Sequence, residues 1–410
     1  MAGARARALA LGCTAGLLLL LSACADCQCP PGPTARPEPQ PPRLDLAPVS
    51  FEALAGWQDH DPSEALVAFR RSCETIRDQP DDQPVGRSPI AGRVGDWRPI
   101  CEDAAALPRG SSGTVARAFF ERWFVPYRVS DRGDPEGLFT GYYEPLLHGS
   151  RRPGGRYTIP LHGPPPDLVR IDLGRFNPDL AGRWIAGRVA DGSFVPYYPR
   201  GAIENGALAA DRLELVWVDD PIDKFFLQIQ GSGRVRLDDG SLIRVGYAAQ
   251  NGHPYRAIGR DLIEIGALSR DQVSMQTIRA WLEANPAAAR KIMDRNRSYV
   301  FFEEQRILDE DEGPLGAQGV PLTAGRSLAV DLRFLPLGAP VWLETTAPFP
   351  EGEGPLRRLM IAQDTGGAID GVVRGDVFWG AGDRAEAIAG RMKSQGRYDL
   401  LLPRALAPTS

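Results

Sequence analysis

The most informative stretch of this sequence is MIAQDTGGAIDGVVRGDVFWG, which runs from Met360 to Gly380. It alternates apolar runs with glycines and carries two aspartates, Asp364 and Asp376, twelve residues apart. Two carboxylates in such a segment can meet in a cleft, where burial or mutual repulsion raises their pKa values. A carboxyl with a raised pKa keeps its proton near neutral pH and can serve as a general acid.

Spacing alone leaves other interpretations open. The chain has 52 acidic residues, and an aspartate before threonine or glycine is usually a turn former. Asp364-Thr365-Gly366 also matches the active-site triplet of aspartic proteases. That interpretation requires two facing triplets. Only one occurs in this chain, with Gln363 where an apolar residue is expected.

The first 24 residues have the pattern of a secretory signal. Arg5 and Arg7 precede an apolar stretch, 8–21, which is too short and too rich in small residues for a spanning helix. Leu21-Ser22-Ala23-Cys24 then resembles a lipoprotein cleavage site, which would leave Cys24 lipidated at the new N-terminus. The alternative is an ordinary signal peptide cut near the same place. Residues 25–48 form a proline-rich tether that cannot pack a core.

Composition sets further bounds on the protein class. A length of 410 residues suggests two domains, and a net charge of −5 gives no support for a nucleic-acid partner. Export to an oxidising compartment favours a disulfide between Cys73 and Cys101 over two unpaired thiols. The four histidines are scattered, so the sequence predicts no zinc site.

Residues 44–128 have a mainly helical pattern, and short strands follow from Gly137 onward. Asp239-Gly240 predicts a hairpin turn between strands 234–237 and 242–247. A last helix is expected from Asp383, with Asp383 as N-cap, Glu386 completing a capping box, and Gly396 as C-cap. The expected helix between the strands is 275–283, and the other expected strands are 157–159, 215–218, 225–229, 299–302, 327–332, 341–343, 359–362 and 398–402.

Several separated motifs carry a family resemblance. They include FTGYYEP (139–145), DKFFLQIQGSG (223–233), GY (246–247), NGHPY (251–255), the helix start SMQ (274–276) and the segment 296–302. Together with the block 366–403, they resemble the membrane-bound lytic murein transglycosylase A family, whose C-terminal part is a "three-aspartate" domain. The resemblance covers roughly residues 130–403, in the family's order.

The resemblance implies an α+β fold made of two β-barrel domains. A helical plus double-psi β-barrel catalytic domain would comprise 49–145 and 319–403, and a smaller β-barrel domain would be inserted at 146–318. A glycan groove would lie between them. The implied activity is that of a peptidoglycan lytic exotransglycosylase, which needs no cofactor. Alternatives are a hydrolytic muramidase with Asp364 as second catalytic carboxylate, and a non-catalytic glycan-binding module.

The resemblance also assigns roles to residues. Asp376 would be the catalytic acid and base, and Asp364 would help to hold its proton and orientation, unless it only forms a turn. The expected partners are peptidoglycan strands, the membrane through the lipid on Cys24, and proteins of cell-wall synthesis or division. We expect a periplasmic location, anchored at the outer membrane. Candidates for the groove are Thr140, Tyr142, Glu144, Gln230, Ser232, Gly366 and Gly367, with strand packing or turn formation as the alternative for several of them.

Overall fold

The computed structural model describes residues 40–180, 183–305 and 312–407. The predicted signal peptide, Cys24 and most of the predicted tether lie outside these residues. The end of the tether is described, and there the expected boundary is wrong. Strand β1 (Leu44–Pro48) pairs antiparallel with β2 (Phe124–Asp131), so the folded body begins before residue 49. Within the described ranges, no helix is both long and apolar enough to cross a membrane.

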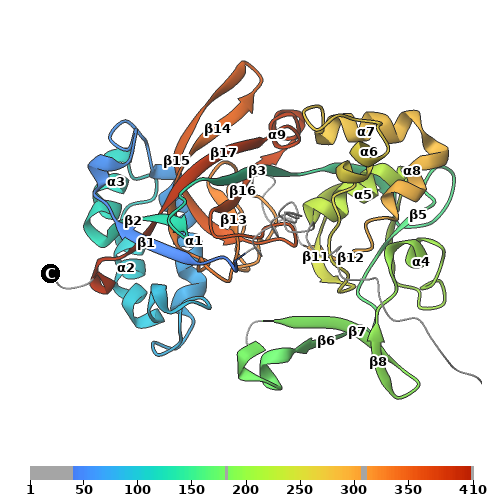
Figure 1. The fold of residues 1–410 in the computed structure, drawn as a ribbon, viewed down its shortest axis with the longest axis horizontal. Helices are drawn as coiled ribbons and strands as arrows, with labels where there is room; N and C mark the ends of the chain where they lie inside the picture. The colour runs from blue at the N-terminus through green and yellow to red at the C-terminus, as the bar shows by residue number, and fades with distance from the viewer. Residues whose placement is uncertain (1–39, 181–182, 306–311, 408–410) are drawn as a thin grey trace, which may run out of the picture. The chain divides into compact units, whose positions relative to one another are not determined.

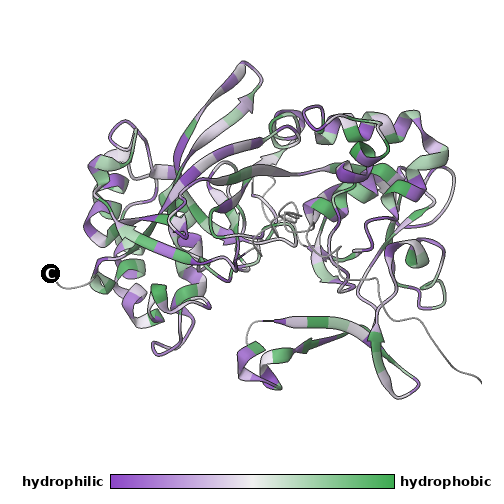
Figure 2. Cartoon of the chain, viewed as in Figure 1, coloured by the Kyte–Doolittle hydropathy of each residue, from purple (hydrophilic) through white to green (hydrophobic). Residues whose placement is uncertain are grey.

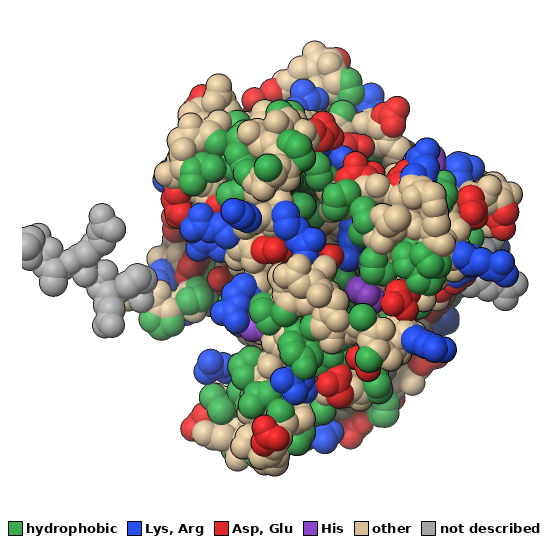
Figure 3. Space-filling model, turned by 90° about the vertical axis from the view of Figure 1, so that its right-hand side faces the viewer, with side chains coloured by type: hydrophobic (Ala, Val, Ile, Leu, Met, Phe, Trp, Pro, Cys, Tyr) green, Lys and Arg blue, Asp and Glu red, His purple; other side chains and the backbone are tan. Residues whose placement is uncertain are grey.

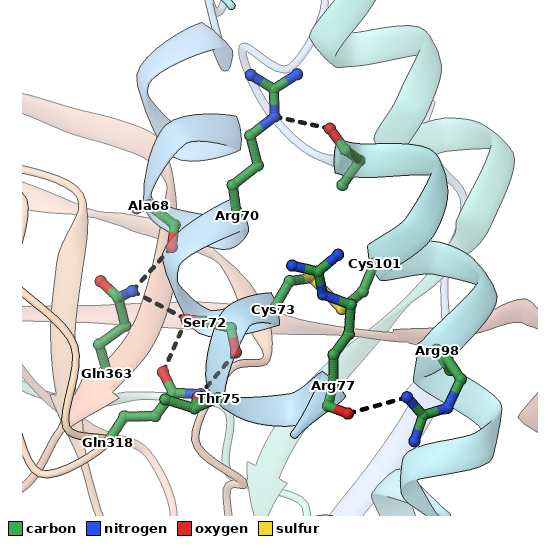
Figure 4. Close-up of a disulfide and its surroundings, with 11 residues drawn as sticks. Ala68, Arg70, Ser72, Cys73, Thr75, Arg77, Arg98, Cys101, Gln318 and Gln363 are labelled. Carbon is green, nitrogen blue, oxygen red and sulfur yellow. Dashed lines mark hydrogen bonds between the residues drawn. A yellow bond between two sulfur atoms is a disulfide. The ribbon is translucent and has the colours of Figure 1, made fainter. Parts of the chain in front are cut away.

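Three helices form the N-terminal part of the body. They are α1 (Ser63–Arg77), α2 (Val94–Ala106) and α3 (Gly113–Trp123), as predicted for a mainly helical segment. Their inner faces share an aromatic cluster in which Phe69 contacts both Trp97 and Phe120. A disulfide joins Cys73 of α1 to Cys101 of α2 (Figure 4). The two ends of the segment are strands because β1 pairs with β2, and β2 pairs with a strand of the barrel.

The main barrel is built from strands that lie far apart in the sequence. Eight strands form one sheet in the order β1-β2-β17-β14-β15-β13-β16-β3, and an additional β17–β3 pairing closes six of them into a ring (Figure 1). Two neighbouring pairs, β13–β15 and β16–β3, are parallel. The remaining bounds are β3 Gly137–Glu144, β13 Ser327–Val330, β14 Pro340–Phe349, β15 Gly352–Asp364, β16 Arg374–Ala381 and β17 Lys393–Pro403.

The segment between β3 and β13 forms the inserted domain. Its six-stranded sheet has the order β12-β11-β10-β4-β9-β5 and encloses a separate core. Figure 2 shows hydrophobic residues in the helices and strands of both domains. The strands are β4 Leu146–Ser150, β5 Ile159–His162, β9 Glu214–Val218, β10 Ser232–Leu237, β11 Leu242–Gln250 and β12 Val300–Gln305. The helices are α4 Arg200–Glu204, α5 Pro221–Gln230, α6 Gly259–Glu264, α7 Met275–Ala284 and α8 Pro286–Met293.

A three-stranded arm extends from the inserted domain. It consists of β6 (Val169–Asp172), β7 (Trp184–Ala190) and β8 (Ser193–Pro196), paired in that order. In Figure 1 the arm lies below the six-stranded sheet. Figure 3 shows acidic and basic side chains interspersed over the face of the molecule that it presents, with no large area of a single sign.

Two local predictions are wrong. Residues 225–229 are not a strand but part of α5, because the Asp220 side chain caps the helix, Pro221 occupies its first turn, and Gly231 ends it with a φ of +82°. Helix α9 (Asp383–Ala389) has Gly382, not Asp383, as N-cap and makes no side-chain cap bond. Its C-cap is Gly390, and Gly396 lies within β17.

Candidate active site

The two aspartates of the initial stretch lie on either side of one small residue. Ala329 of β13 is the register partner of Asp364 on β15 and also of Asp376 on β16. Asp376 is in turn the partner of Thr140 on β3. Register partners point to the same face of a sheet, so these four side chains form one row across the barrel. The methyl group of Ala329 leaves room between the two carboxyl groups.

A short hydrogen-bond chain holds the Asp376 carboxyl. Thr140 Oγ1 donates to Asp376 Oδ1 at 2.6 Å, and the Arg374 guanidinium donates to Thr140 Oγ1 at 2.8 Å. Arg374 precedes Asp376 by two residues on the same strand, so both point to the same face. The Thr140 hydroxyl therefore links the Arg374 guanidinium to the Asp376 carboxyl and fixes the position of one carboxyl oxygen.

Asp364 has both of its oxygens engaged. Tyr142 donates its phenolic hydroxyl to Oδ2 at 2.7 Å, and the backbone N–H of Ala317 donates to Oδ1 at 2.9 Å. The preceding Gln363 is fully buried, and its amide donates to the carbonyl of Ala68 and the hydroxyl of Ser72 on α1 (Figure 4). Helix α1 thus anchors the strand end that carries Asp364.

Burial dominates the electrostatics of the carboxyl pair. Desolvation raises the pKa of Asp376 to about 6, against the opposing effects of Arg374 and the Thr140 hydrogen bond. Desolvation also raises the pKa of Asp364, opposed by the hydrogen bonds from Tyr142 and Ala317. A carboxyl with a pKa near 6 can both donate and accept a proton close to neutral pH. Asp376 has these properties and Thr140 orients it, so the site can perform general acid–base chemistry.

Three other predicted groove residues lie where the two domains join. Glu144 is 1% exposed and pairs with Arg234 of β10 at 2.9 Å and Arg244 of β11 at 2.6 Å. Gln230 accepts a hydrogen bond from the backbone N–H of Tyr143 at 3.0 Å, and Ser232 is buried in β10. In this structure these side chains bind protein groups or are buried, and they tie β3 to the inserted domain.

Gly366 and Gly367 lie in the exposed turn that follows β15. A Cβ atom on Gly367 would meet no neighbouring atom within 4 Å, and one on Gly366 would only touch Ile369 at 3.5 Å. Packing within the chain therefore does not require glycine at either position. Close approach of a bound strand remains the reason for predicting them as site residues.

Sequence reasoning missed two residues near Asp376. Arg374 could have been found, because its spacing of two places it on the same side of a strand as Asp376. Tyr255 comes from the inserted domain, and the negative charge of Asp376 contributes to raising its pKa, after burial as the main cause. The motif 251–255 was the available signal. Within the ranges that the structure describes, no group of three or more His, Cys, Asp or Glu residues is placed to hold a metal ion.

Fold and site together define a protein of two β-domains whose closed barrel carries an aspartate with a pKa raised to about 6. Protein-family models match in the same two regions: the "MltA specific insert domain" at residues 138–303 and the "3D domain" at 326–402. A membrane-bound lytic murein transglycosylase from Agrobacterium tumefaciens has a solved structure that is 35% identical. The match has a TM-score of 0.77 and covers 88% of this chain and 98% of that one.

Two Escherichia coli proteins extend the comparison. The membrane-bound lytic murein transglycosylase A of strain K12 is 32% identical over 270 residues, which are 64% of this chain and 65% of that protein. The crystal structure of E. coli MltA with bound chitohexaose is 26% identical with a TM-score of 0.59, covering 89% and 95% of the two chains. The chain belongs to the membrane-bound lytic murein transglycosylase A family, and the predicted α+β fold with two β-domains is confirmed.

Proposed function

We propose that this chain is a lytic transglycosylase that cleaves the β-1,4 bond between N-acetylmuramic acid and N-acetylglucosamine in peptidoglycan. The observation that carries the proposal is the Asp376 carboxyl, hydrogen-bonded by Thr140 and with its pKa raised to about 6. The names of the relatives, lytic murein transglycosylases, and the sugar oligomer bound to E. coli MltA support the same substrate class.

Asp376 performs both proton transfers. Protonated, it gives its proton to the glycosidic oxygen as the bond from that oxygen to C1 of the muramyl sugar breaks. The sugar ring becomes oxocarbenium-like. Ionised Asp376 then takes the proton of the same sugar's 6-hydroxyl as that oxygen bonds to C1. The products are a 1,6-anhydromuramyl end and a free 4-hydroxyl on N-acetylglucosamine, with no water consumed.

The state of Asp364 supports a mechanism with one catalytic carboxylate. Both of its oxygens accept hydrogen bonds from the protein, from Tyr142 and from the Ala317 amide, so it is poorly suited to act as a nucleophile or to activate water. Intramolecular attack by the 6-hydroxyl has a large effective molarity and needs no second carboxylate. Asp364 instead adds negative charge that helps Asp376 to retain its proton.

The test is mass spectrometry of muropeptides released from intact sacculi in ¹⁸O-labelled water. We expect anhydro-ended products without label from the wild type, none from Asp376→Asn, and wild-type activity from the exposed control Asp59→Asn. Reducing ends carrying ¹⁸O would identify a hydrolytic muramidase instead. Sacculus binding without any cutting would indicate a glycan-binding module. Cleavage of a peptide substrate that is lost in Asp364→Asn would favour a protease.

We further propose that the enzyme works at the bacterial envelope as a periplasmic lipoprotein, anchored at the outer membrane through Cys24. The names of the relatives, which are membrane-bound, support the envelope. The mature protein should carry the mass of diacylglycerol on Cys24 and lose it in Cys24→Ala. An unmodified N-terminus at Ala25 would contradict the anchor.

A further inference from the structure

A cavity lined by arginines lies between the arm and the helical part of the body. It has a volume of about 510 Å³, and most of its wall comes from β6, the start of β7 and the turn between them. Arg170, Arg175 and Arg183 come from the arm, and Arg87 comes from the loop between α1 and α2. Four guanidinium groups around one cavity make a site for an anion.

The cavity holds little negative charge of its own. Asp172 is the one carboxylate in its lining, and that carboxylate accepts the backbone N–H of Gly174 at 3.0 Å. Arg170, Arg175 and Arg183 form no ion pair with any residue that the structure describes. Since charges of one sign that are held together repel, the cluster favours binding an anion from outside the chain.

Two aromatic side chains also line the cavity, so its wall is partly apolar. The Arg170 guanidinium stacks over Trp184 at 4.5 Å from the ring centre, which leaves the N–H groups at the guanidinium edge able to donate. Phe176 in the same lining is 77% exposed, an unusual state for a large apolar side chain. Guanidinium groups beside exposed rings suit a ligand that carries carboxylates on a partly aliphatic chain, as a peptide does.

A second cavity shares a lining residue with the arginine cavity. It has a volume of about 380 Å³, and Arg87 lines it as well. Ala317, whose amide holds Asp364, also lines the second cavity. Arg87 is thus shared between the arginine cavity and a cavity that is also lined by Ala317, the residue whose amide bonds Asp364.

We propose that the arginine cavity binds the carboxylates of the peptide stem that a muramyl residue of the glycan strand carries. This inference rests on the proposed function, because it assigns a part of the same substrate to a second place on the chain. Binding there favours strands that still carry their stems over strands from which an amidase has removed them.

The test compares Arg175→Gln/Arg183→Gln with a matched control, Arg270→Gln, an exposed arginine in the loop before α7. Dissociation constants for both kinds of strand are measured with the full chain carrying Asp376→Asn, so that nothing is cut, and kcat/KM is measured with Asp376 present. We expect the double variant to lose about tenfold in affinity and kcat/KM on stem-bearing strands, and less than twofold on stripped strands. The control should match the wild type on both.

Equal losses on stem-bearing and stripped strands, or no loss on either, would overturn the proposal. So would arginine-dependent binding to vesicles of phosphatidylglycerol together with an unchanged stem preference, because the cavity would then serve an anionic lipid. If the wild type cut neither strand, the proposed function would fail, whereas the ratio of the dissociation constants would still decide the role of the cavity.

Discussion

Replacement of Asp376 by asparagine should stabilise the folded protein at neutral pH while it removes activity. Burial raises the pKa of Asp376 from its ordinary 3.8 to about 6, so the folded state prefers the protonated carboxyl. The stability associated with this group is fully present below pH 3.8 and is lost as pH rises through 6. Asparagine is neutral at every pH and avoids that loss.

The size of the effect follows from the pKa difference. A rise of about two pH units corresponds to about 3 kcal/mol, since one unit is worth ~1.4 kcal/mol. Asp376 is partly exposed to solvent, which reduces the cost of ionisation, and the asparagine loses the attraction of Arg374. We therefore expect Asp376→Asn to gain about 1 to 3 kcal/mol in the free energy of unfolding at pH 7.5 and little at pH 4.

Urea unfolding followed by circular dichroism between pH 4 and 8 measures this difference. The free energy of unfolding of Asp376→Asn minus that of the wild type should grow with pH and level off above about pH 6.5. Asp59→Asn, at an exposed position, serves as the control for replacing an aspartate by asparagine. A difference that stays constant with pH, or that has the opposite sign at pH 7.5, would refute the raised pKa of Asp376 in the folded protein.

Three further substitutions test the surroundings of the site. Arg374→Gln removes the charge that lowers the pKa of Asp376, so the alkaline limb of the kcat/KM profile should move to higher pH. A shift to lower pH would contradict an effect of Arg374 on the Asp376 carboxyl. Cys73→Ala removes the disulfide to Cys101, which spans a sequence separation of 28 residues. It should lower the free energy of unfolding, measured with urea, by about 3 to 4 kcal/mol. A change near zero would argue against a structural role of the disulfide. Glu144→Gln leaves two arginines without their shared carboxylate and should lower the free energy of unfolding by about 3 kcal/mol or more; loss of glycan binding at unchanged stability would instead make Glu144 a groove residue.

The sequence predicted those features correctly that depend on residues close together in the chain. The stretch 360–380 identified both aspartates, and the Asp239-Gly240 turn predicted the β10–β11 hairpin, which forms with the expected antiparallel pairing. The family resemblance supplied the two-domain architecture, because no periodicity in short strands specifies which ones close into a barrel. The hairpin depends on neighbouring residues, whereas the architecture was predicted from several motifs that occur in the same order as in the family.

Other features depend on contacts that no local pattern reveals. The run 225–229 is apolar and short, so its periodicity fits a strand as well as a helix. The deciding residues, Asp220 and Gly231, lie outside it. Glu144 was predicted as one of several groove residues because sugars suit a mixture of aromatic faces and amide or hydroxyl partners, and its role in binding sugar stays a prediction. Its partners, Arg234 and Arg244, are about a hundred residues away and become neighbours only when β3 meets the inserted domain.

The carboxyl pair itself shows how topology builds the site. Asp364 and Asp376 are twelve residues apart, and simple hairpin pairing would set their strands side by side. Instead β13, from more than thirty residues upstream, lies between β15 and β16 and pairs with both. Its Ala329 lies between the two aspartates, so their backbones are two strand spacings apart, roughly 10 Å. The pair therefore cannot form until β13 has joined the barrel, and the residue at position 329 sets how much space lies between the two acids.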